Sequence, residues 1–192
     1  AWGLPEGQRR PDRAKRFLPE NSFQISSVAV SPDGKLLAAC GDERSVKLLD
    51  AATGSLVRLL EGHEDAVGAV TFSPDGKIAL AGASFPTKDD TETEEGLHLF
   101  AVEGAAAPRV LAAPAHQLRA VAFTPDGKRI AFTSNRTGDY DLWLMNADGT
   151  GLRNLTRHKA QDNFAAWSPD GKKIAFISNR AGGHDVYIMP VD

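Results

Sequence analysis

The sequence predicts an all-β protein built from four similar units, and three observations lead to this fold class. The pentapeptide SPDGK at 31–35 returns as SPDGK at 73–77, TPDGK at 124–128 and SPDGK at 168–172. Successive copies begin 42, 51 and 44 residues apart, and a period in this range indicates a repeat architecture. The residues that flank each copy alternate between large and small or polar side chains, which is typical of β-strands.

The first two strands of each unit lie on either side of the pentapeptide. The strand before it carries an alternating pair of residues: Val28 and Val30, Val70 and Phe72, Val121 and Phe123, and Ala165 and Trp167. The strand after it contains one of the runs LLAAC, IALAG, RIAFTS and KIAFIS. Proline presets the first turn angle, aspartate bonds to its own backbone and glycine supplies a positive φ. The pentapeptide is therefore interpreted as a hairpin turn and not as a catalytic site.

Each unit continues with a third strand, and three units continue with a fourth. The third strands are SVKLLD at 45–50, GLHLFA at 96–101, DLWLM at 141–145 and DVYIM at 185–189. The fourth strands are SLVRLL from 55, RVLAA from 109 and LRNLT from 152. Four short antiparallel strands in a repeat of this length predict the blades of a β-propeller. The predicted blades span about 21–60, 63–113, 116–156 and 160–192 of a single propeller domain or half-propeller, 1–192.

The stretch AKRFL at 14–18 is predicted to be the fourth strand that the last blade needs. It closes that blade either in the same chain or in a partner chain. Three arrangements satisfy this expectation: a closed ring of four blades, a homodimer that forms a ring of eight blades, or part of a longer propeller. The homodimer and the longer parent are favoured over the lone four-bladed ring, because closing four blades requires steep angles between neighbours.

Two halves of the chain resemble two propeller families. The stretches SVKLLDAATGSLVRLLEGH and EGHEDAVGAVTFSPDGKIALAG, which together run from 45 to 82, resemble WD repeats. The stretches IAFTSNRTGDYDLWLMNADGTGLRNLTRH from 130 and IAFISNRAGGHDVYIM from 174 look like TolB-type blades. The resemblance implies a noncatalytic scaffold that binds a protein or peptide on its loop face or in its central channel. The alternatives are the gating propeller of a prolyl-oligopeptidase-like enzyme and a metal-dependent hydrolytic propeller.

The composition of the chain argues against nucleic acid and membranes as partners. The formal net charge of −3 offers no general attraction to nucleic acid or to an anionic membrane, so neither is expected as a partner. No apolar run approaches the roughly 20 residues needed to span a bilayer, so a soluble protein is expected. The TolB resemblance suggests an exported, periplasmic protein of bacteria, whereas WD repeats occur in many compartments, so the resemblance leaves the compartment open. The single cysteine, Cys40, lies in an apolar run and is expected to be a small buried residue.

The candidate binding residues lie in loops at the strand ends opposite the SPDGK turns. They are His63, Glu64, Asp65, His116, Arg136, Arg157, His158, Arg180 and His184. The histidines recur blade by blade and so surround a ring, and no metal site or cofactor is expected. No nucleophile elbow, zinc helix motif or phosphate loop is present, so no catalytic residue is predicted. The acidic loop at 88–95 is interpreted as a solvated insertion, with docking of a basic partner or weak calcium binding as alternatives.

Overall fold

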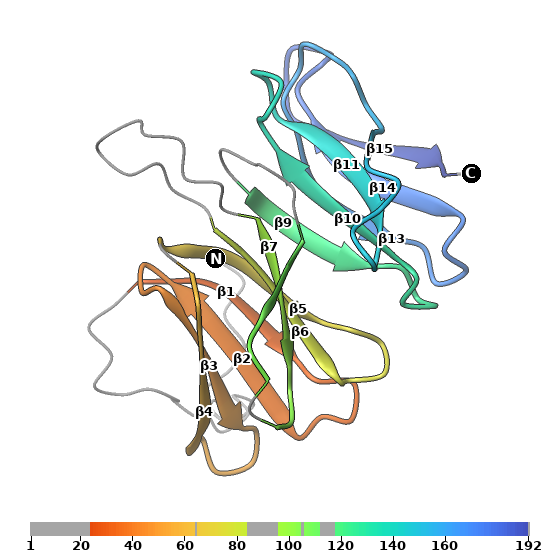
Figure 1. Cartoon of the computed structure of the whole chain (residues 1–192). Coiled ribbons are helices and arrows are strands. Elements are labelled where there is room, and N and C mark those ends of the chain that lie inside the picture. Colours follow the sequence, from red (N-terminus) through yellow and green to blue (C-terminus); the bar gives the residue numbers. More distant parts are fainter. Residues whose placement is uncertain (1–23, 64, 84–95, 105, 112–117, 192) are drawn as a thin grey trace, which may run out of the picture.

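The computed structural model describes residues 24–63, 65–83, 96–104, 106–111 and 118–191, and within them it contains four antiparallel sheets (Figure 1). The first sheet has the order β1-β2-β3-β4, with strands Ile25–Val30, Leu36–Gly41, Ser45–Asp50 and Leu56–Glu61. The second has the order β5-β6-β7-β8, with strands Val67–Phe72, Ile78–Ala83, Leu97–Ala101 and Arg109–Leu111.

The third sheet has the order β9-β10-β11-β12, with strands Leu118–Phe123, Arg129–Ser134, Asp141–Asn146 and Arg153–Asn154. The fourth has the order β13-β14-β15, with strands Asp162–Trp167, Lys173–Ser178 and Asp185–Pro190. The strands of each sheet come from one of the four repeated sequence units, and β4 ends at Glu61. The prediction of an all-β propeller is confirmed. The predicted closing strand at 14–18 lies outside the described residues.

The four SPDGK-type turns share one hydrogen-bonding pattern, which explains why the pentapeptide repeats. In the first turn Ser31 Oγ donates to Asp33 Oδ1 at 2.7 Å, and Lys35 N donates to the same oxygen at 3.1 Å. Gly34 adopts a φ of 72°, which favours glycine. The hydroxyl of Ser31 and the amide of Lys35 hold the pKa of Asp33 below its usual value. The interpretation of the pentapeptide as a hairpin turn is confirmed.

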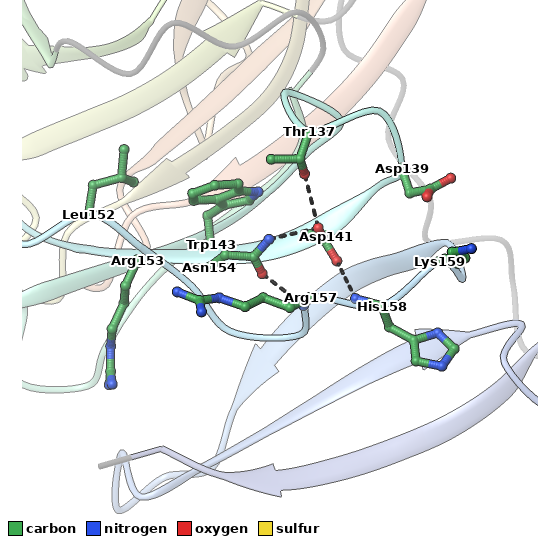
Figure 2. Close-up of a pocket in the computed structure, with 10 residues that line it drawn as sticks. All are labelled: Thr137, Asp139, Asp141, Trp143, Leu152, Arg153, Asn154, Arg157, His158 and Lys159. Atoms are coloured by element: carbon green, nitrogen blue, oxygen red, sulfur yellow. Dashed lines mark hydrogen bonds between the residues drawn. The ribbon is translucent and has the colours of Figure 1, made fainter.

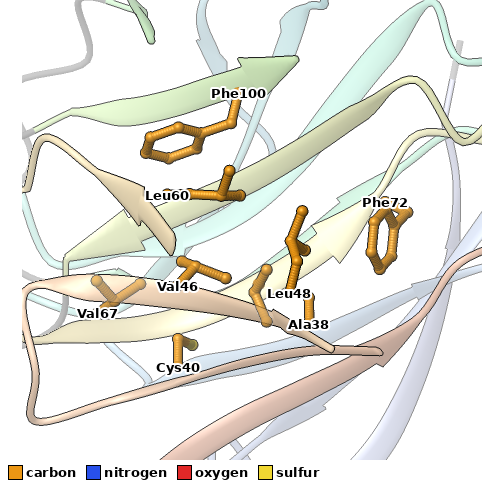
Figure 3. Close-up of a cluster of buried hydrophobic side chains, with 9 residues drawn as sticks. Ala38, Cys40, Val46, Leu48, Leu60, Val67, Phe72 and Phe100 are labelled. Atoms are coloured by element: carbon orange, nitrogen blue, oxygen red, sulfur yellow. The ribbon is translucent and has the colours of Figure 1, made fainter. Parts of the chain in front are cut away.

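Neighbouring sheets pack face to face through their first strands, since β1 contacts β5, β5 contacts β9, and β9 contacts β13. The core between the first two sheets is drawn in Figure 3, with Ala38, Cys40, Val46, Leu48 and Leu60 from the first and Val67, Phe72 and Phe100 from the second. Cys40 is fully buried, as predicted, and this burial raises the pKa of its thiol to about 12. The apolar alternation of the strands therefore builds the contacts between blades, which leaves the strand-end loops to present functional groups.

Candidate functional site

A cavity of about 550 Å³ opens at the loop ends of the third sheet, away from the SPDGK turns. Strand β11, strand β12 and the loops at each end of this strand pair form its walls (Figure 2). The lining residues are Thr137, Asp139, Asp141, Trp143, Leu152, Arg153, Asn154, Arg157, His158 and Lys159. Two of them, Arg157 and His158, belong to the predicted binding set, and the structure places them together in this one cavity.

Asp141, the first residue of β11, organises the cavity wall. Its side chain is buried, and its Oδ2 accepts hydrogen bonds from Thr137 Oγ1 at 3.1 Å and from Asn154 Nδ2 at 2.7 Å. Its Oδ1 accepts from Thr156 Oγ1 at 3.0 Å and from the backbone N–H of His158 at 3.3 Å. These bonds, several of which appear in Figure 2, tie the loop before β11 to the segment after β12. A buried carboxylate with four donors is satisfied, so the loop is held in one geometry.

The segment after β12 turns sharply so that its charged side chains reach solvent. Asn154 Oδ1 accepts hydrogen bonds from the N–H groups of Thr156 and Arg157, each at 3.0 Å. Arg157 adopts a φ of 39°, a left-handed conformation that is rare for a residue with a side chain. His158 Nδ1 accepts from Ala160 N at 3.0 Å, so this imidazole caps the entry to the next blade. His158 therefore supports the turn through its ring nitrogen, and the side chain of Arg157 is exposed beside it.

The cavity combines cationic and apolar groups. Exposed Arg153, Arg157 and Lys159 surround it. The indole of Trp143 and the side chain of Leu152 provide apolar wall, and exposed Asp139 is the acid at the rim. Because the carboxylate of Asp141 is buried and hydrogen-bonded, the accessible charge of the cavity is positive. Such a surface suits a peptide that carries carboxylates beside an apolar side chain.

His63 is not on the loop surface but inside the second blade. It is 5% exposed, and its ring stacks on His98 of β7 with a centroid distance of 3.9 Å. The ring of Phe100 also contacts His63, with 5.8 Å between the ring centroids. Burial, with a smaller effect of neighbouring His98, lowers the pKa of His63 to about 3. In this arrangement the His63 imidazole is inaccessible to a partner.

Arg180 is held within its own blade. Its Nη2 donates to both carboxylate oxygens of Asp162, at 3.0 and 2.9 Å, and Asp162 is fully buried. Arg180 belongs to the tripeptide Ser178-Asn179-Arg180, which repeats the sequence of residues 134–136 and is called the SNR motif below. Asn179 Oδ1 accepts from Gln161 N at 2.8 Å, so the motif anchors the entry to strand β13 of its own blade. Arg136 in the third blade stacks over Trp143, with 4.6 Å between the guanidinium carbon and the ring centroid.

The other predicted residues are separate. Asp65 Oδ1 accepts from Ala66 N at 2.7 Å, and His184 is exposed in the fourth blade. Glu64, His116 and the acidic loop at 88–95 lie outside the described residues. Within the described ranges no three His, Cys, Asp or Glu side chains are close enough to hold a metal ion. No helix in these ranges is long and apolar enough to cross a membrane.

Sequence reasoning missed Asp141, Trp143 and Lys159. Asp141 begins the third strand of its blade, and the aligned residue in the next blade, Asp185, is exposed. An aspartate at a strand start carries no signal of burial by itself. The polar residues Asn154 and Thr156, 13 and 15 residues further along the chain, could have indicated this burial, because amide and hydroxyl groups are natural partners of a buried carboxylate.

Comparison with known proteins divides the chain into two halves. The family profile of the TolB beta propeller domain matches residues 91–192, which is more than half of the chain. The profile of the WD domain, G-beta repeat, matches residues 13–50 and 54–91. These two matches coincide with the two resemblances seen in the sequence.

The individual relatives include both WD-repeat proteins and TolB. The chain is 26% identical to the Periodic tryptophan protein 2 homolog of Neurospora crassa over 138 residues, covering 68% of this chain and 14% of that protein. It is 52% identical to the Tol-Pal system protein TolB of Anaeromyxobacter dehalogenans over 40 residues, covering 21% of this chain and 9% of TolB. The chain therefore spans only a small part of the length of these relatives.

A solved structure of Kuenenia stuttgartiensis Hydrazine Synthase superimposes with a TM-score of 0.67. The match covers 88% of this chain and 55% of that chain at 21% sequence identity. At this identity the likeness supports the propeller fold alone.

Proposed function

Because this chain belongs to the TolB-type β-propeller family and carries WD repeats in its first half, we propose that it is a noncatalytic scaffold that binds a protein or peptide partner on its loop face. WD-repeat proteins typically serve as protein-interaction scaffolds. Propellers of both kinds present their loops on a rigid stack of blades, which suits recognition.

The observation that carries the proposal is the cavity beside Asp141. The four hydrogen bonds to this carboxylate hold the cavity wall before any partner arrives. A preformed surface loses less conformational entropy on binding than a loose one. Arg157 and Lys159 then supply charge at the rim and Trp143 supplies an aromatic wall. We propose an acidic peptide segment with an apolar side chain as the partner.

The proposal is tested with two fluorescein-labelled peptides of about ten residues, one alternating Glu with Leu and the other Lys with Leu. Fluorescence anisotropy measures both dissociation constants. We expect the acidic peptide to bind and the basic one not to bind. The double charge reversal R157E/K159E should weaken binding of the acidic peptide by about tenfold or more, because attraction becomes repulsion.

The matched control is K35E/K128E, which makes the same charge change on two exposed lysines of the SPDGK turns. Its dissociation constant should stay within about twofold of the wild type, since these lysines lie at the opposite ends of the strands. Equal binding of the two peptides, or an unchanged constant for R157E/K159E, would show that the cavity does not select acidic partners.

A second proposal concerns self-association, and it arises from the outer face of the fourth sheet. In β11 the side chains of Leu142 and Leu144 are buried against the fourth sheet. The residues 44 positions later, Val186 and Ile188 of β15, are 73% and 67% exposed. Their neighbour Tyr187 points to the third sheet, so these two side chains point away from it. The outer face of the fourth sheet is therefore apolar and exposed, whereas the corresponding face of the third sheet is covered by the next blade.

The first sheet shows the complementary face. Val70 and Phe72 of β5 are buried against the first sheet. The residues 42 positions earlier, Val28 and Val30, are 67% and 60% exposed. We propose that a second copy packs its first sheet on this copy's fourth sheet, so that the interface continues the packing between blades and two such contacts close an eight-bladed ring.

Light scattering across a dilution series measures the molar mass. We expect the wild-type protein to have twice the mass of one chain. The substitution V186D/I188D should give the mass of one chain, because burying two carboxylates in the interface costs more free energy than the apolar contact provides. The control V110D alters an exposed apolar residue of β8 and should leave the dimer intact. A wild-type monomer at every concentration would overturn this proposal.

A further inference from the structure

The SNR motif holds its arginine in the same way in the third and fourth blades. Arg136 N donates to Ser134 Oγ at 3.3 Å, and Arg180 N donates to Ser178 Oγ at 3.3 Å. The guanidinium Nε of each arginine points at the same hydroxyl, at 3.5 and 2.9 Å. Each guanidinium also stacks over two aromatic rings of its own blade, Phe132 and Trp143 in the third and Phe176 and Tyr187 in the fourth.

The two arginines differ in what surrounds their Nη2 atoms. Arg180 Nη2 donates to the carboxylate of Asp162. The residue 44 positions before Asp162 is Leu118, which is fully buried in the core between the second and third sheets. Arg136 Nη2 is buried, and no acceptor among the described residues lies within hydrogen-bond distance of it. The third blade therefore keeps the cation of the motif without the carboxylate.

A second unsatisfied donor lies beside the first. The indole N–H of Trp143 is buried and has no acceptor among the residues that the structure describes. Its ring is the one over which the Arg136 guanidinium stacks at 4.6 Å. Burial lowers the pKa of Arg136 to about 10, which leaves the group charged at neutral pH. Buried donors without partners are uncommon in folded proteins, and two together indicate a missing acceptor.

We propose that Arg136 and Trp143 form a binding site for a carboxylate supplied from outside the third blade. The fourth blade shows the kind of partner that the motif takes, since there the carboxylate of Asp162 accepts from Arg180. In the third blade Leu118 fills the position of that aspartate, so the proposed carboxylate comes from outside the blade. A carboxylate accepts charge-assisted hydrogen bonds from a guanidinium and has lone pairs left for the indole N–H. A metal cation would be repelled by the guanidinium, and a basic group would leave both donors unsatisfied. The ligand is a free small carboxylate or a carboxylate of a peptide. Trp143 also lines the cavity beside Asp141, but this proposal rests on Arg136 Nη2 and the indole N–H and not on the charged rim of that cavity.

The test records the indole N–H resonances of Trp143 and Trp167 by ¹⁵N-edited NMR during a titration with sodium acetate. Sodium chloride and sodium phosphate titrations at matched ionic strength are the comparisons. We expect a saturable shift of the Trp143 resonance with acetate alone, while Trp167 stays in place. In R136M this shift should be lost, and in R136K the affinity should fall by about fivefold or more, because lysine lacks the planar fork. Titration with an acetyl-capped glutamate dipeptide and its amidated glutamine analogue then separates a peptide carboxylate from free acetate.

R136M is expected to fold, because it removes only the 3.5 Å hydrogen bond from Nε to Ser134 Oγ, and the backbone N–H of residue 136 still donates to that hydroxyl. Its thermal unfolding curve shows whether it does. If R136M does not fold, R136K carries the comparison. A non-saturable shift, an undiminished response in either variant, or an equal response to phosphate would overturn the assignment of a carboxylate site.

Discussion

Replacement of Arg180 by methionine is expected to lower the free energy of unfolding by about 3 kcal/mol. The change leaves the carboxylate of Asp162, which is fully buried, without the nitrogen that donates to both of its oxygens. Loss of one partner of a buried ion pair typically costs 3 to 5 kcal/mol, and the lower value applies because the Arg180 side chain keeps 28% of its surface exposed. Denaturant unfolding followed by far-UV circular dichroism measures the change.

R136M is the matched control for R180M. It makes the same substitution in the same motif, over the same kind of aromatic pair, in a blade where Leu118 replaces the aspartate. Its free energy of unfolding should stay within about 1 kcal/mol of the wild type in buffer without carboxylates, because a desolvated cation is removed with its unsatisfied nitrogen. Equal losses in R136M and R180M would show that stacking on the aromatic rings, and not the ion pair, determines the contribution of this motif.

Acidification from pH 8 to pH 5 is expected to cost about 2 kcal/mol of stability through His63 alone. The pKa of His63 is about 3 in the folded chain, against an ordinary value of 6.5. Above pH 6.5 the imidazole is neutral in both states and contributes no pH dependence. Between pH 6.5 and pH 3 the unfolded chain binds a proton that the folded chain excludes, so stability falls by about 1.4 kcal/mol per pH unit.

The variant H63F isolates this contribution. Phenylalanine keeps an aromatic ring against His98 and Phe100 but does not titrate. The difference in unfolding free energy between H63F and the wild type should therefore grow by about 2 kcal/mol as the pH falls from 8 to 5. Urea unfolding at several pH values measures both proteins. Parallel pH profiles would contradict the burial of a neutral His63.

The strands and turns could be predicted from the sequence because their causes are local. The turn at Ser31 depends on hydrogen bonds within five residues and on a positive φ at Gly34. Four copies of this turn then set the spacing of the blades, and the alternation around Val28 or Val121 identifies strands without any knowledge of their neighbours. The burial of Cys40 followed from the same apolar run.

The candidate site could be predicted only in part. Position relative to the turns placed Arg157 and His158 on the loop face, and the structure brings both to one cavity. Asp141 escaped notice because its burial depends on Asn154 and Thr156, which lie 13 and 15 residues away and reach it only when β11 and β12 pair. His63 is the opposite case, since it was expected on the loop face but is buried. Its loop-like sequence context gave no sign that His98 would cover it.

The sequence by itself determined the class of fold, the number of sheets and the connection within each, because repeated turn chemistry and strand periodicity act over a few residues. Tertiary structure alone decided which polar side chains are satisfied. Arg180 and Arg136 belong to the same motif, yet Arg180 donates to a buried aspartate on the neighbouring first strand of its blade, whereas the corresponding position on the first strand of the third blade holds a buried leucine, Leu118. Whether a buried charged group finds a hydrogen-bond partner depends on the side chains around it, and strand pairing and packing bring these side chains together from different segments of the chain.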